Sequence, residues 1–172
     1  MEYNVVLNSL PKTLEELKAL PEADLKKPEY VVAFTVAALN VFPSDKEECY
    51  KMLDYLKGPN PLSNMDKQFI ADRFMDGKDY IPRSYFTGAT SENNYKPNEP
   101  FTVWMKDSAA QIAEEGYKRF DLRSGGADST RPVTLRTKPS TGEWFLWEQL
   151  LLAGNIVLPI HKSVGNKLLI HV

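Results

Sequence analysis

The feature that most constrains the fold is a change in the period of the apolar residues near position 101. Before it, apolar residues recur at helical spacing, as in Cys49, Met52, Leu53 and Leu56. After it they alternate with polar residues, as in Phe101, Val103 and Met105, which is typical of half-buried strands. We therefore predict an α+β protein, with an N-terminal helical layer packed on a C-terminal antiparallel β-meander or half barrel.

The segment from Val31 to Phe42 predicts a helix at the centre of the molecule. It is apolar on all sides, which is typical of a helix covered on every face. A helix that crosses a bilayer needs about 20 apolar residues, so this one is too short to do so. We therefore expect it to be buried in the protein core.

Capping and stop signals predict four short helices within residues 1–77. They start near Thr13, Pro28, Ser44 and Ser63, where N-cap residues or a first-turn proline are found. Pro21, Gly58 and Asp76-Gly77 mark the ends of three of them.

The remaining chain is predicted to contain a strap and a sheet, within a single domain of residues 1–172. Residues 78–100 are rich in proline and in aromatic residues, which favours a loop that packs on the core. Residues 101–172 form the β part, with one or two helical turns at residues 108–116 and a last strand at Leu168–Val172.

Composition excludes several classes of protein. The 21 basic and 23 acidic side chains leave a net charge of −2, which argues against attraction of the whole chain to nucleic acid or to acidic lipids. The single cysteine, Cys49, excludes an intramolecular disulfide, and no cofactor or metal site is predicted. The N-terminus lacks the pattern of a signal peptide, so we expect a soluble cytoplasmic protein without a membrane partner.

Positive charge is concentrated in residues 117–138, which carry six basic and two acidic side chains. If two strands pair here as a hairpin, alternation places their polar side chains on one face of the sheet. Arginine binds carboxylate and phosphate groups bidentately, so this face could bind an anion. The candidate ligand-binding residues are Arg119, Arg123, Arg131, Arg136 and Trp144. The alternative is an ordinary solvated face with a cross-strand pair between Asp121 and an arginine.

The same region carries a family resemblance. The order Arg119–Ser129, Arg131–Arg136 and Trp144–Trp147 resembles a family of small bacterial proteins classed as a domain of unknown function. The resemblance covers roughly residues 28–160 and is clearest over residues 117–148. It implies no activity, so no catalytic residue can be carried over from it.

Catalytic patterns are missing from the sequence. The two histidines, His161 and His171, lie outside any metal-binding motif, and Cys49 lies on an apolar helix face. The glycine-rich segment Ser124–Thr130 could expose backbone N–H groups to an anion, yet it lacks the strand–loop–helix context of a nucleotide-binding loop. These observations favour a non-catalytic binding module for an acidic protein partner or a small anion, in an oligomeric state left open.

Two alternatives remain open. The first is a small hydrolase or transferase for an anionic substrate, with Arg123 and Arg136 as clamps and Asp121 or Asp128 as the base. The second is single-stranded nucleic-acid binding, with Trp104, Trp144 and Trp147 as an aromatic platform.

Overall fold

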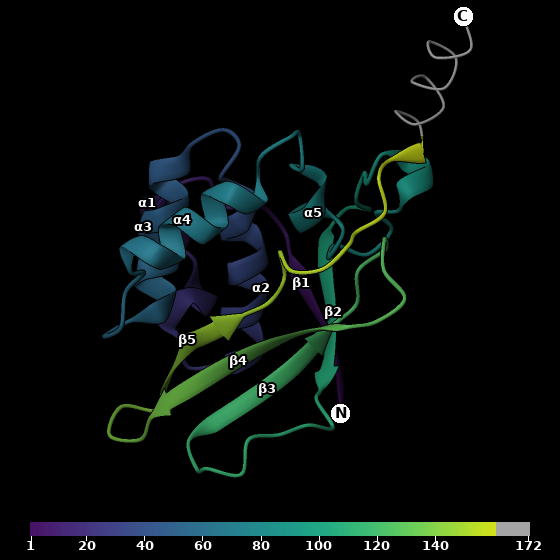
Figure 1. Cartoon of the computed structure of the whole chain (residues 1–172). Helices are drawn as coiled ribbons and strands as arrows, with labels where there is room; N and C mark the ends of the chain where they lie inside the picture. The colour runs from purple at the N-terminus through teal and green to yellow at the C-terminus, as the bar shows by residue number, and fades with distance from the viewer. Residues whose placement is uncertain (161–172) are drawn as a thin grey trace, which may run out of the picture.

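The computed structural model describes residues 1–160 and confirms the α+β class (Figure 1). The helices are α1 (Leu14–Lys18), α2 (Pro28–Leu39), α3 (Lys46–Lys57), α4 (Asn64–Arg73) and α5 (Tyr80–Arg83). The strands are β1 (Glu2–Leu7), β2 (Phe101–Asp107), β3 (Tyr117–Leu122), β4 (Arg131–Lys138) and β5 (Glu143–Gln149). Short 3₁₀ helices span Pro21–Asp24 and Ser91–Asn93.

The five strands form one antiparallel sheet in sequence order, with β1 and β5 at its edges. The prediction that all helices precede the strands is wrong, because β1 begins the chain and pairs with β2 along its whole length. Few side chains of β1 face the core, since only Val5 and Leu7 are buried. Its apolar residues Val5, Val6 and Leu7 are consecutive in the sequence, so they do not form the alternating pattern that predicted the other strands.

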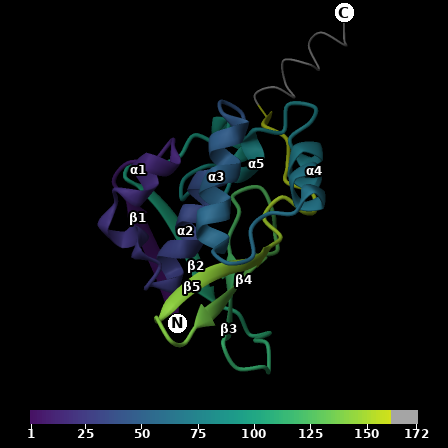
Figure 2. The same ribbon diagram turned by 90° about the vertical axis from the view of Figure 1, so that its left-hand side faces the viewer.

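Helix α2 lies at the centre of the molecule, as its apolar sequence predicts. Every residue from Val31 to Leu39 is buried, and Pro28 occupies the first turn. The helix contacts both edge strands, β1 and β5. Helix α2 therefore reaches across the sheet from one edge to the other, and Figure 2 shows it beside β1 and β5.

Helices α1, α3 and α4 begin near their predicted starts and differ at some ends, whereas α5 lies in the segment that was predicted to be a loop. Thr13 and Ser63 accept N-cap hydrogen bonds as expected. The N-cap of α3 is Asp45 rather than Ser44, because the Asp45 carboxylate accepts the Glu48 N–H while the Ser44 hydroxyl donates to the Val41 carbonyl. Helix α4 ends at Arg73, before the predicted Asp76-Gly77 stop.

The strap of residues 78–100 packs on the core. Its aromatic side chains are buried: Tyr80, Tyr85, Phe86 and Tyr95. Three of the hydroxyls donate to backbone carbonyls of the segment that follows β5: Tyr80 to Ile156, Tyr85 to Leu151 and Tyr95 to Val157. Burial raises the pKa of Tyr95 to about 12, so this hydroxyl remains a donor at neutral pH. The strap thereby fixes residues 150–157 in place.

Residues 108–116 form a loop instead of the predicted helical turns. The Ser108 N–H donates to the Arg119 carbonyl, and the Gln111 side chain bonds to backbone groups of Ser108 and Arg119. These hydrogen bonds to β3 replace the local ones that a helix would form. The predicted last strand, Leu168–Val172, lies outside the described residues.

We expect the Cys49 thiol to be inert in the folded protein. The residue is fully buried on α3, and burial raises the pKa of its thiol from 9.0 to about 12. Because the thiolate is the reactive form, labelling by DTNB at pH 8 should be at least tenfold slower in buffer than in denaturant. Equal labelling rates in buffer and in 6 M guanidinium would contradict this burial.

Candidate functional site

The basic hairpin forms as predicted, from β3 and β4. Tyr117 lies opposite Arg136 at one end, and Leu122 lies opposite Arg131 at the other. Arg119 lies opposite Thr134 on the outer face, and its Nε donates to the Thr134 hydroxyl over 3.1 Å. Within residues 1–160, no ion pair joins Asp121 to an arginine, so the predicted cross-strand pair is absent there.

Arg119 and Arg131 serve the fold. Arg119 also donates to the Ala110 carbonyl and so ties the loop 108–116 to the sheet. Arg131 donates to the backbone carbonyls of Ser129, Ala153 and Asn155, which joins the glycine-rich loop to the segment after β5. Both guanidinium groups donate to carbonyl or hydroxyl oxygens of the protein, which leaves fewer of their N–H groups for an external anion.

Arg123 lies over a tryptophan at the far end of the hairpin. Its guanidinium carbon is 3.9 Å from the centroid of the Trp104 ring, in cation–π contact. The pair borders a small pocket of about 230 Å³ beside residues 84–90. Arg136 lies opposite Tyr117, which is six positions before Arg123, so the two arginines are about 20 Å apart along the sheet. The predicted clamp from these two arginines does not form.

Arg136 borders a groove, which we call the Arg136 groove. It has a volume of about 380 Å³ and is lined by Lys57, Pro59, Asn60, residues 136–139, Phe145 and Trp147. The guanidinium carbon of Arg136 lies 5.1 Å from the centroid of the Trp147 ring and 5.4 Å from that of Tyr117. The two rings meet edge to face, with centroids 5.7 Å apart. Arg136 thus lies on an aromatic platform that limits its rotamers.

A β-bulge places Trp147 in this groove. Leu146 lies opposite Leu135 and Glu148 lies opposite Thr134, so Trp147 is the extra residue in β5. A bulge changes the direction of the side chain that it carries. Lys57, at the end of α3, donates from Nζ to the Trp147 carbonyl over 3.3 Å. Residues far apart in sequence therefore build one wall of the groove.

The end of α3 approaches β5 closely at Gly58. A Cβ added at this position would lie 2.3 Å from the Phe145 ring, and its φ of +64° is one that glycine adopts readily. This contact holds Lys57, Pro59 and Asn60 beside the strand. Sequence reasoning missed Lys57 and Tyr117 as site residues, and it considered Trp147 only as part of an aromatic platform with Trp104 and Trp144. Tyr117 was the easier of them to find, because alternation places it on the same face of the strand as Arg119.

Trp144 lies away from the groove. Its side chain is partly buried against the hydrophobic core, and the backbone N–H of Trp144 donates to the Leu25 carbonyl over 2.7 Å. Trp147, by contrast, is 40% exposed. Trp104 lies under Arg123, so the three tryptophans form no common platform and the predicted arrangement for stacking bases is absent.

The glycine-rich loop also differs from an anion-binding loop. The Gly125 N–H donates to the Ser84 carbonyl, and the Gly126 N–H donates to the Ser124 hydroxyl. Both donors are therefore used within the protein. A Cβ on Gly125 would lie 1.8 Å from the Ala89 carbonyl oxygen, so glycine is required for close backbone packing. Within residues 1–160, no cluster of three or more His, Cys, Asp or Glu side chains is placed to hold a metal ion.

No helix in the described part of the chain is both long and apolar enough to span a bilayer.

A family model matches residues 9–157, and the family is described as a domain of unknown function (DUF6935). This match confirms the resemblance to an uncharacterised family and extends it toward the N-terminus. Neither a curated protein nor a solved structure matches the chain.

Proposed function

This chain belongs to the DUF6935 family, whose description assigns no activity, and we propose that it is a non-catalytic binding module. Its Arg136 groove takes a carboxylate-rich segment of a partner protein. Guanidinium and ammonium groups bind carboxylates through charge-assisted hydrogen bonds, which are the strongest polar contacts available at such a surface.

The charge of the groove is the observation that carries this proposal. Three of its lining residues are cationic, Lys57, Arg136 and Lys138, and none is acidic. Among the described residues, no carboxylate forms an ion pair with any of them. The aromatic contacts of Arg136 hold its guanidinium in place without neutralising it. The groove is therefore a preformed positive surface on a chain that is acidic overall.

Arg136→Ala should weaken the binding of a fluorescein-labelled decaglutamate peptide about tenfold or more, because it removes charge-assisted hydrogen bonds. Fluorescence anisotropy at low salt measures the affinity. Arg123→Ala is the matched control, since this exposed arginine also lies on a tryptophan but borders a different pocket. Raising the salt from 50 to 200 mM should weaken binding to the parent protein, because exposed charges are screened.

The proposal fails if decaglutamate does not bind the parent protein at low salt. It also fails if both arginine variants weaken binding equally, because the attraction would then be general rather than local. A labelled oligothymidylate that binds more tightly than decaglutamate would favour single-stranded nucleic acid instead.

A further inference from the structure

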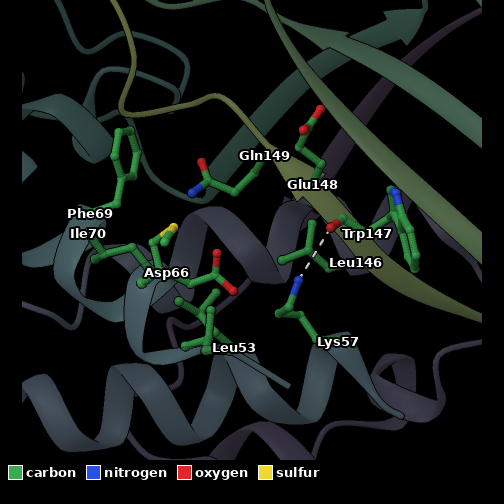
Figure 3. A pocket seen from close by; sticks show the side chains of 11 residues that line it. Leu53, Lys57, Asp66, Phe69, Ile70, Leu146, Trp147, Glu148 and Gln149 are labelled. Carbon is green, nitrogen blue, oxygen red and sulfur yellow. Dashed lines mark hydrogen bonds between the residues drawn. The ribbon is translucent and has the colours of Figure 1, made fainter. Parts of the chain in front are cut away.

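A pocket with a partly apolar lining lies beside the Arg136 groove, and we call it the Met65 pocket (Figure 3). Its volume is about 420 Å³. Helices α3 and α4, the loop between them and strand β5 supply its apolar lining: Leu53, Leu62, Met65, Phe69, Ile70 and Leu146. The pocket therefore offers hydrophobic contacts where the neighbouring groove offers positive charge.

Two side chains on α4 are unusually exposed for their type. Met65 is 81% exposed and Phe69 is 45% exposed, and they lie one helical turn apart. The same helix packs against the core through Ile70, which is buried, so it does not need Met65 or Phe69 for this contact. A capping box between Ser63 and Asp66 fixes the start of the helix and hence the position of Met65. Exposed apolar side chains gathered around a pocket are typical of interaction sites, and methionine adapts well to varied partners.

The two cavities adjoin. Lys57 and Trp147 line both of them, and the hydrogen bond from Lys57 Nζ to the Trp147 carbonyl marks the boundary (Figure 3). An extended segment that crosses this boundary would touch the apolar lining on one side and Arg136 on the other. The surface is continuous with the groove of the proposed function.

The two cavities differ in charge, which determines how a bound acidic segment would be oriented on this surface. The acidic residues of the Met65 pocket are Asp66 and Glu148, whereas the Arg136 groove has none. One Asp66 carboxylate oxygen accepts the Ser63 N–H, and Glu148 points away from Lys57 in Figure 3. Acidic residues of a partner would be repelled at the Met65 end and attracted at the Arg136 end.

We infer that the partner is a peptide segment of another protein in which apolar anchor residues adjoin a run of acidic residues. The apolar residues occupy the Met65 pocket, and the acidic run occupies the Arg136 groove. This inference rests on the proposed function, because it assigns the acidic run to the same groove. It adds the apolar half of the motif and the order in which the segment lies.

Two fluorescein-labelled peptides test the inference by anisotropy. The mixed peptide carries Leu-Trp-Leu-Leu followed by six glutamates, and the acidic peptide is decaglutamate. We expect the mixed peptide to bind the parent protein at least tenfold more tightly. Met65→Glu should remove most of that gain, so that this variant binds the mixed peptide about as tightly as it binds decaglutamate. Because Met65 is exposed, the variant should keep its fold, which circular dichroism checks.

Met75→Glu is the matched control. Met75 is also an exposed methionine, at 58%, and it lines neither cavity, so this variant should bind both peptides as the parent does. Arg136→Ala should weaken the binding of both peptides, because both place glutamates in the Arg136 groove.

The outcomes separate the two proposals. If decaglutamate binds through Arg136 and the mixed peptide gains nothing, the apolar half of the motif is wrong and the proposed function stands. If Met65→Glu and Met75→Glu reduce the gain equally, the Met65 pocket is again not the anchor site. If neither peptide binds, or if Arg136→Ala affects neither, the proposed function fails and this inference fails with it.

Discussion

Val36→Asp should abolish cooperative folding of this chain. Val36 lies in the middle of α2 with no exposed surface, and the helix is covered by α3, α5, β1 and β5. An aspartate there buries a charge without a partner or forces the carboxyl to bind a proton at neutral pH. Either form should cost roughly 4 kcal/mol or more, a large part of the 5–15 kcal/mol that stabilises a typical domain. Urea unfolding followed by circular dichroism measures the loss.

Val6→Asp is the matched control for this prediction. Val6 is also a valine, but it lies on the edge strand β1 and is 38% exposed. Its replacement should change the unfolding free energy by about 1 kcal/mol or less. A Val36→Asp protein with the unfolding midpoint of the parent would show that α2 is not the centre of the core.

Gly125→Ala should destabilise the protein by about 3 kcal/mol, although it adds only one methyl group. That methyl would lie 1.8 Å from the Ala89 carbonyl oxygen, which belongs to backbone and cannot turn aside. Relief would require the strap and the loop to separate, which breaks the hydrogen bond from the Gly125 N–H to the Ser84 carbonyl. For a chain of this size we expect a fall in Tm of roughly 6–12 °C, measured by calorimetry.

Gly142→Ala is the control for Gly125→Ala, because it introduces backbone strain without close packing. Gly142 has a φ of +77° and open space around it, so alanine there meets no neighbour but adopts a strained backbone. It should cost about 1 kcal/mol. If Gly125→Ala were no more destabilising than this control, the close approach of the strap to the glycine-rich loop would be wrong.

Local patterns in the sequence predicted several elements of the fold. The apolar stretch of α2, the capping residues Thr13 and Ser63, and the alternation of β2, β3 and β4 agree with the structure. Each depends on neighbours within about one helical turn or one strand. The family resemblance was also readable from the order of residues 117–148. Alternation further predicted that Arg119 and Thr134 share a face, which the register of β3 and β4 confirms.

The sequence did not separate the candidate arginines from one another. Arg119 and Arg131 each donate to backbone carbonyls of distant loops, whereas Arg123 and Arg136 each lie on aromatic rings. Alternation places Arg119, Arg123 and Arg136 on one face of the sheet, but it does not tell what each side chain contacts. Their different environments arise from contacts between segments that are far apart along the chain.

The sequence by itself determined the helical and strand character of most segments, the buried centre at α2 and the basic outer face of the hairpin. Only the tertiary structure decided that β1 joins the sheet, that Gly125 serves close packing, and that Lys57 meets Trp147. The physical reason is the distance along the sequence between the residues that interact. Secondary structure and amphipathic faces follow from side chains a few positions apart, whereas a groove is built where helix and strand pack together. The Arg136 groove and the Met65 pocket both lie at such a junction, between α3 and β5.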